Sequence, residues 1–182
     1  EGVKTVAYSY LGPKVTYGIY KDGTIGAAKR HIEATADVLH DFLQKKYHGE
    51  AYISLSKALM TKASAVIPIF PLYALLLYRV MKEKGIHEGT IEQKQRLLKD
   101  MLYGDKPEFD EFRRLRPDNW EMREDVQAEV EALWDTVTPE NFKEVGDFEG
   151  IKREFMNLNG FGFDNVDYDA DLDLEELAKL QP

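Results

Sequence analysis

Residues 3–10 read VKTVAYSY, a run of β-branched and aromatic residues that stops at Leu11-Gly12-Pro13. Such a run, closed by glycine and proline, predicts a buried strand followed by a loop. Residues 25–46, IGAAKRHIEATADVLHDFLQKK, carry apolar residues at helical spacing, and residues 51–60, AYISLSKALM, predict a second strand. Strand, helix and strand in this order indicate a right-handed crossover in a parallel sheet, and therefore an α/β fold.

The predicted helix has clear signals at both ends. Asp22-Gly23 supplies a turn, Thr24 can cap the first turn of the helix, and His48-Gly49 ends it. Seven residues recur at helical spacing along it: Ala28, Ile32, Thr35, Ala36, Leu39, Phe42 and Leu43. These residues predict one face that packs on the sheet.

The most apolar part of the chain is ASAVIPIFPLYALLLYRVM, residues 63–81. Pro68 and Pro71 interrupt it, and its continuous helical part, Leu72 to Met81, is far shorter than the roughly 20 residues that a bilayer needs. We therefore predict a buried helix and no membrane span.

The rest of the chain reads as polar-faced helices. Residues 90–104 and 118–137 predict two of them, Pro139 starts a short third one, and an acidic tail from residue 161 ends in a small helix. We divide the chain into the end of the sheet (1–62), pocket helices (63–104) and a C-terminal helical region with the acidic tail (105–182).

Composition excludes several functions. The 182 residues carry a net charge of -9, which argues against a nucleic-acid partner, because phosphate binding needs a clustered positive surface. The chain has no cysteine, so thiolate catalysis and cysteine-bound zinc are excluded. A cytoplasmic location is compatible with this composition.

Tyrosine and lysine side chains brought together can perform acid–base chemistry. Three pairs lie near one another in the chain: Tyr10 and Lys14, Tyr17 and Lys21, and Tyr20 and Lys29. The first two pairs have a spacing of four, which shares a helix face, but Gly12-Pro13 and Gly18 argue against a helix there. The third pair has a spacing of nine, which faces opposite sides of one continuous helix. A turn at Asp22-Gly23 would remove that obstacle, so spacing permits this pair without selecting it.

Longer stretches carry a family resemblance. They are VAYSYLGPKVTYGIYKDGTIGAAK, LSKALMTKASAVIPIFPLY, YRVMKEKGIHEG, EDVQAEVEALWDTVTPENFKE and EFMNLNGF. Together they resemble the bacterial trans-2-enoyl-CoA reductases, a family that includes single-chain enoyl-acyl-carrier-protein reductases, over nearly the whole chain. This family is an enlarged relative of the short-chain dehydrogenases, with a Tyr-x8-Lys active site. Tyr20 and Lys29 match that pattern.

The resemblance implies a Rossmann-type parallel sheet flanked by helices, and reduction of an enoyl thioester by NADH. Tyr20 would be the proton donor, while Lys29 would hold the nicotinamide ribose and make the tyrosine a better acid. Tyr10 matches a second tyrosine that contacts the substrate. Leu59-Met60-Thr61 matches a segment beside the nicotinamide, and Tyr78 is a candidate for limiting the acyl chain, although core packing explains an aromatic residue there equally well.

One family feature has no counterpart. The Gly-rich dinucleotide loop of the family's N-terminal half is not present, and Gly160-Phe161-Gly162 follows no strand, so we interpret it as a turn. We therefore expect this chain to be the C-terminal half of a longer polypeptide, with the N-terminal half as its partner. Substrates carried by CoA and by acyl carrier protein are not separated by these residues.

Other patterns carry less weight. Residues 165–176 place acidic side chains at calcium-loop spacing, but Ala170 occupies the position that needs glycine, so we interpret this stretch as a solvated tail. The histidines show no metal-ligand spacing, and no nucleophile motif of a hydrolase is present. The alternative function is a non-catalytic helical binding module. The enzyme requires Tyr10, Tyr20 and Lys29 to converge on one cleft beside Thr61, and the module does not.

Overall fold

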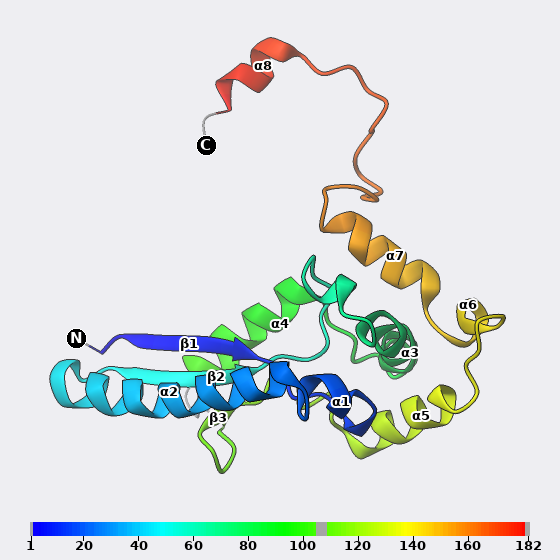
Figure 1. Ribbon diagram of the computed structural model, residues 1–182. Helices are drawn as coiled ribbons and strands as arrows, with labels where there is room; N and C mark the ends of the chain where they lie inside the picture. The colour runs from blue at the N-terminus through cyan, green and yellow to red at the C-terminus, as the bar shows by residue number, and fades with distance from the viewer. Residues whose placement is uncertain (1, 105–108, 181–182) are drawn as a thin grey trace.

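The computed structural model describes residues 2–104 and 109–180, so the predicted boundary at residue 105 lies outside the described residues. In chain order the elements are β1 (Lys4–Ser9), η1 (Lys14–Thr16), α1 (Tyr17–Tyr20), α2 (Thr24–Tyr47), β2 (Glu50–Leu55), η2 (Ser64–Val66), α3 (Phe70–Glu83), α4 (Thr90–Arg96), η3 (Leu97–Leu102), β3 (Arg114–Leu115), α5 (Glu124–Trp134), α6 (Phe142–Val145), α7 (Phe148–Asn157) and α8 (Leu174–Lys179). Figure 1 shows α2 running along the sheet, α3 within the helical part, and the C-terminal segment extending away from both.

The three strands form a parallel sheet in the order β1-β2-β3. Lys4 pairs with Glu50 and Ser9 with Leu55, so β1 and β2 match over their whole length. The connection between them is α2, which confirms the predicted strand, helix and strand of an α/β fold. The second strand ends at Leu55 instead of continuing to Met60.

The predicted cap of α2 is wrong by one residue. Gly23 is the N-cap in an extended conformation, Thr24 is the first helical residue, and no side chain caps the helix. His48 ends α2 in the left-handed conformation, with φ of 51°, as expected at a helix C-terminus.

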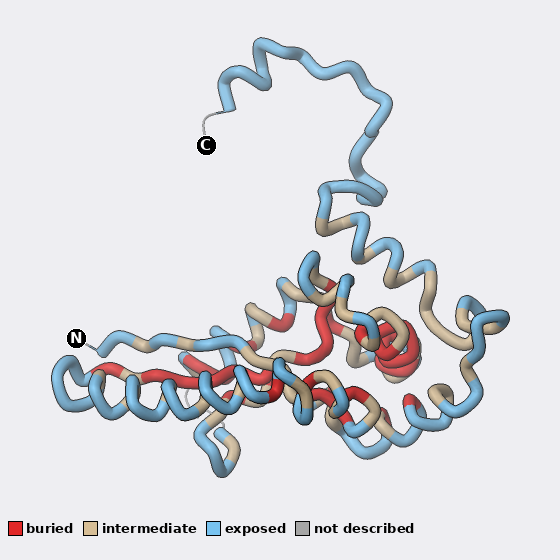
Figure 2. The backbone as a smooth tube through the Cα atoms, in the orientation of Figure 1, coloured by how far each residue is buried: buried red, intermediate tan, exposed pale blue. Residues whose placement is uncertain are grey.

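The prediction that β1 is buried is also wrong. No residue of β1 is buried and Tyr8 is 53% exposed, whereas β2 is buried from Ala51 to Leu55 (Figure 2). The physical reason is that β1 is the edge of the described sheet, and α2 packs mainly against β2. Of the residues of α2 only Gly26 is buried. Several of its apolar side chains are exposed: Ile25, Ile32, Val38, Leu39 and Phe42.

The core is built around α3, which begins two residues earlier than predicted. Pro71 lies in its first turn, where a missing N–H costs no helical hydrogen bond. The side chains from Tyr73 to Tyr78 are all buried, and Val126 and Val130 of α5 pack against them. None of the helices among residues 2–104 and 109–180 combines the length and apolar character that crossing a membrane requires.

The C-terminal region differs from its prediction in several places: strand β3 was not predicted, and the short helix expected from Pro139 begins at Phe142. Helix α5 begins at Glu124, not at Asp118, because residues 118–121 form a turn in which Met122 N–H donates to the Asp118 carbonyl. Helix α7, capped by Asp147, was not predicted. The predicted tail with a final small helix is confirmed: residues 161–180 are exposed and contain α8.

Candidate active site

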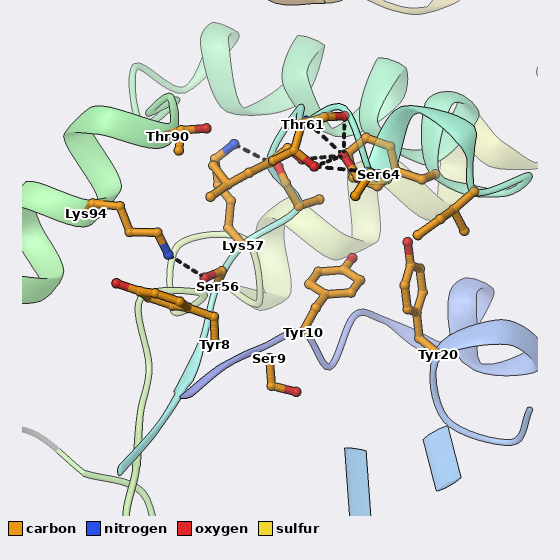
Figure 3. A pocket seen from close by; sticks show the side chains of 15 residues that line it. Tyr8, Ser9, Tyr10, Tyr20, Ser56, Lys57, Thr61, Ser64, Thr90 and Lys94 are labelled. Carbon is orange, nitrogen blue, oxygen red and sulfur yellow. Dashed lines mark hydrogen bonds between the residues drawn. The ribbon is translucent and has the colours of Figure 1, made fainter. Parts of the chain in front are cut away.

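A cavity of about 500 Å³ lies at the carboxyl ends of β1 and β2. Figure 3 shows Tyr10 and Tyr20 on one side of it, Tyr8 and Lys94 on the other, and Thr61 above them. None of the described residues that line it is acidic. The carboxyl ends of parallel strands are where α/β sheets bind their ligands, so this cavity is the candidate active site.

Two tyrosines meet at one wall of this cavity. Tyr10 follows β1 and Tyr20 ends α1, and their ring centroids lie 4.8 Å apart in an edge-to-face arrangement. The turn between them depends on Gly12, which has φ of 70° and where a Cβ would overlap the Thr16 hydroxyl and the Tyr10 ring. Thr16 closes the turn by donating to the Pro13 carbonyl at 2.8 Å.

Lys29 approaches both tyrosines from α2. Its Nζ lies 4.6 Å from the centroid of the Tyr20 ring and 5.3 Å from that of Tyr10, and it donates to the Tyr10 carbonyl. The chain turns between α1 and α2, where Gly26 packs so closely on the Lys21 carbonyl that a Cβ would overlap it. The turn at Asp22-Gly23 therefore brings the pair with nine-residue spacing together, as the sequence permitted.

The prediction that no helix joins Tyr17 and Lys21 is wrong for residues 17–20. Residues 17–20 are helical despite Gly18, and Lys21 Nζ lies 4.3 Å from the centroid of the Tyr17 ring. Neither residue lines the cavity, and Lys14, the lysine of the remaining pair, is exposed.

Burial sets the protonation of the central pair. It raises the pKa of Tyr20 to about 12, with a smaller contribution from the Glu121 charge. It lowers the pKa of Lys29 to about 8, opposed by Glu33. Lys29 is not among the causes of the raised pKa of Tyr20, so the expectation that Lys29 makes Tyr20 a stronger acid stays a prediction. Tyr20 is protonated at neutral pH, and its hydroxyl has no hydrogen-bond partner among the described residues.

The segment from Lys57 to Thr61 forms another wall. Leu59 and Thr61 line the cavity, while Met60 is 4% exposed and packs into the core. The Thr61 and Ser64 hydroxyls lie 3.0 Å apart, and Ser64 also donates to the Leu59 carbonyl. Of the segment expected beside the nicotinamide, two of three side chains thus face the cavity.

Tyr78 is fully buried and is not among the residues that line the cavity. Its hydroxyl accepts from Met60 N–H at 2.9 Å and donates to the Ala58 carbonyl at 3.0 Å. The structure therefore places Tyr78 behind the cavity wall, where it fixes the backbone of residues 58–60 instead of facing the cavity.

Replacing Tyr78 by Phe should lower the free energy of unfolding by about 1–3 kcal/mol, because Met60 N–H loses its buried partner. Chemical denaturation of the two proteins measures this difference. Tyr47→Phe, at a tyrosine that is 50% exposed, is the matched control and should change little. Equal losses of unfolding free energy in both variants would contradict the role of the Tyr78 hydroxyl in fixing the backbone of residues 58–60.

Sequence reasoning missed two residues that line the cavity, Lys57 and Lys94, and one that lies behind its wall, Glu121. Glu121 is 0% exposed and accepts hydrogen bonds from Tyr10, from Tyr73 and from Ala58 N–H. The Nζ of Lys57 lies 4.3 Å from the Tyr78 ring centroid, and the Nζ of Lys94 donates a hydrogen bond to the Ser56 hydroxyl at 3.0 Å. Burial lowers the pKa of both lysines to about 8. The sequence signal was weak: a carboxylate between Trp120 and Met122 reads as the polar side of a helix.

No metal site accompanies the cavity: in residues 2–104 and 109–180, no group of three or more His, Asp or Glu side chains is arranged to hold an ion. His87 instead pairs with Glu154 at 2.8 Å.

Comparison with known protein families assigns the chain that forms this cavity to a family. A model described as the trans-2-enoyl-CoA reductase catalytic region matches residues 1–103, and one described as the enoyl reductase FAD-binding domain matches residues 109–172. The first alone covers more than half of the chain. The chain belongs to the trans-2-enoyl-CoA reductase family. The family resemblance is thereby confirmed.

Individual reductases of this family are similar to this chain in sequence and in structure. Trans-2-enoyl-CoA reductase (NADH) of Clostridium beijerinckii is 54% identical over 98% of this chain, and enoyl-acyl-carrier-protein reductase (NADH) 2 of Photobacterium profundum is also 54% identical over 98%. The crystal structure of the Clostridium acetobutylicum trans-2-enoyl-CoA reductase with NAD matches with a TM-score of 0.92 at 53% identity over 98% of this chain and 46% of that one. The Treponema denticola reductase with NAD matches with a TM-score of 0.85 at 47% identity, over 94% of this chain and 43% of that one. The chain spans 45% of the length of the two curated relatives.

Proposed function

We propose that this chain forms the catalytic part of an NADH-dependent reductase of trans-2-enoyl thioesters. The observation that carries the proposal is that Tyr10, Tyr20 and Thr61 line one cavity, while Lys29, which does not itself line it, lies over both tyrosine rings. The family membership and the names of the relatives support it. The alternative, a non-catalytic helical binding module, predicts packed tyrosines without a shared cavity.

The proposed reaction consumes an enoyl thioester, NADH and a proton, and yields the saturated acyl thioester and NAD+. NADH supplies a hydride to the β-carbon, and negative charge then develops on the thioester oxygen as an enolate. The Tyr20 hydroxyl is protonated, has no competing partner among the described residues and lines the cavity, so it can donate to that oxygen.

Protonation at the α-carbon completes the reduction of the double bond. Lys29, charged below about pH 8, is the group to hold the ribose hydroxyls of the nicotinamide half. Tyr10 would contact the substrate, and Leu59 and Thr61 would lie beside the nicotinamide, with Met60 and Tyr78 holding that segment from behind.

The residues present fit only part of the cofactor. No Gly-rich phosphate loop follows β1, so the pyrophosphate and adenosine need groups from elsewhere. We infer that the N-terminal half of the same polypeptide supplies them and extends the sheet at β1 into a Rossmann-type fold. The exposed edge of β1 and the exposed apolar side chains of α2 support this inference, because such a surface is costly in water.

The names of the relatives and the molecules bound in the similar structures support a choice of cofactor, substrate carrier and cellular location. One matching model is described as FAD-binding, but the relatives are named for NADH and the similar structures hold NAD or NADH, so we propose NADH. The carrier of the substrate is CoA or acyl carrier protein, since relatives of both names match equally well. Both carriers and NADH point to fatty acid metabolism in the cytoplasm.

The function is tested with the joined polypeptide, that is, residues 1–182 together with the N-terminal half. NADH absorbance should fall when crotonyl-CoA is added and should stay constant without it. The same assay with enoyl-acyl carrier protein compares the two carriers. A folded joined polypeptide that binds NADH but oxidises it with neither thioester would contradict the proposal.

A further inference from the structure

The carboxylate of Glu121 is the most highly connected buried group next to the cavity. Its Oε1 accepts from the Tyr10 hydroxyl at 3.0 Å and from the Tyr73 hydroxyl at 2.8 Å, and its Oε2 accepts from Ala58 N–H at 2.7 Å. Glu121 itself does not line the cavity, so it acts on the site only through these partners.

These three donors come from separate parts of the fold. Tyr10 follows β1, Ala58 follows β2, and Tyr73 lies on α3, whereas Glu121 lies in the turn before α5. Gln127 of α5 locks the arrangement, because its amide donates to the Glu121 carbonyl at 2.7 Å and to the Tyr73 hydroxyl at 3.1 Å. One carboxylate from the region of the second family model thus joins three elements of the first.

The hydrogen bond from Tyr10 has a chemical consequence. A phenol has one proton to donate, and Tyr10 gives it to Glu121, so its oxygen can offer only lone pairs to a bound molecule. Tyr20, whose hydroxyl has no partner in the described part of the chain, keeps its proton for the substrate. The two tyrosines 4.8 Å apart therefore have different chemical capacities.

Glu121 accepts these three hydrogen bonds as a carboxylate, the form that predominates above about pH 7. Burial raises its pKa to about 7, while hydrogen bonds from Tyr73 and Ala58 and the charge of Lys57 hold it down. Lys57 is 2% exposed and makes no ion pair within 4 Å in the described residues, so it balances the carboxylate only at a distance. The hydrogen bonds are therefore the main support of the charged form.

We propose that Glu121 is a positioning residue that fixes the Tyr10 hydroxyl as an acceptor, leaves Tyr20 as the proton donor, and sets the spacing between Tyr10 and the wall that begins at Ala58. This role rests on the proposed reductase function. It adds a residue from outside the Tyr-x8-Lys pattern to the working site.

Glu121→Gln in the joined polypeptide tests the role. Its amide presents N–H donors where an oxygen now accepts, so it cannot serve all three donors. We expect kcat to fall about 10- to 100-fold, as for loss of a charge-assisted hydrogen bond, with the NADH dissociation constant within about threefold of wild type. Glu129→Gln, at an exposed carboxylate of α5, is the matched control and should leave kcat unchanged.

A double-mutant cycle separates positioning from general weakening. If Glu121 acts through Tyr10, Glu121→Gln should add little to the loss in kcat/KM already caused by Tyr10→Phe. Losses that multiply, or an unchanged kcat in Glu121→Gln, would overturn the proposal.

Hydrogen exchange measured by mass spectrometry reads the contact without activity. Peptides that contain Ala58 should exchange faster in Glu121→Gln than in wild type and in Glu129→Gln. Unchanged exchange in Glu121→Gln would overturn the proposed contact between Glu121 and Ala58 N–H. If Glu121→Gln exchanges faster than wild type but wild type reduces no thioester, the reductase function fails while the contact itself stands.

Discussion

Replacing Tyr20 by Phe should lower kcat of the joined polypeptide by about 10²- to 10⁴-fold, the usual contribution of a positioned general acid. The change removes one oxygen from a ring that is 6% exposed, and that oxygen has no partner among the described residues, so folding should be little affected. NADH affinity should stay within about threefold, because the phenylalanine ring keeps the contact with Lys29. Steady-state kinetics with crotonyl-CoA and NADH titration measure the two effects separately.

Tyr17→Phe is the matched control for this experiment. Tyr17 lies on the same short helix and also has a lysine over its ring, but it does not line the cavity. Its replacement should leave turnover unchanged. Full turnover in Tyr20→Phe would remove Tyr20 from the mechanism, and equal losses in both variants would point to a general disturbance of α1.

Local patterns were sufficient for β1, α2 and β2, but not for α1, which carries Tyr20, or for the end of β2. The strand, the helix and the second strand were predicted from periodicity, and the turn at Asp22-Gly23 was identified as the condition for Tyr20 to meet Lys29. Selection of that pair needed the family resemblance, because spacing alone left it as one of three. The structure adds the close packing of Gly26 on the Lys21 carbonyl, which no local pattern reveals.

The missed residues depend on contacts between distant parts of the chain. Glu121 accepts hydrogen bonds from Tyr10, 111 residues earlier in the chain, and from Ala58, 63 residues earlier. Nothing in its local sequence distinguishes it from a solvated glutamate. Tyr78 was expected at the acyl pocket because its helix was expected there. Its hydroxyl instead faces the backbone of residues 58–60, which only the path of the chain after β2 determines.

The burial of β1 was overestimated for a different reason. The pattern of residues 3–10 is typical of a strand with neighbours on both sides, and the described sheet gives it one. Sequence therefore reports the environment for which the strand is suited, whereas the structure reports the environment that these residues alone provide. The same reasoning applies to Val38 and Phe42 of α2, which are 71% and 44% exposed. Both observations agree with the proposal that an N-terminal half covers this surface.

Replacing Lys29 by Ala should weaken NADH binding by about 10- to 100-fold and lower kcat as well, since a charged donor to the ribose and a contact of both tyrosine rings are lost together. Lys21→Ala is the matched control, because Lys21 is exposed and lies over Tyr17, a tyrosine that does not line the cavity. NADH titration should show wild-type affinity in the control. Wild-type affinity in Lys29→Ala would exclude the ribose-binding role.

The pH dependence of NADH binding gives this prediction its sharpest form. Burial lowers the pKa of Lys29 to about 8, so Lys29 is charged at pH 7 and loses its proton as the pH rises through 8. Wild-type affinity should therefore decline on the alkaline side, and Lys29→Ala should have a flat, lower profile. Lys57 and Lys94 also have a pKa of about 8, so an alkaline decline in wild type does not identify the group by itself. A decline that persists in Lys29→Ala would assign it to one of those two lysines, because only removal of the responsible ammonium can abolish it.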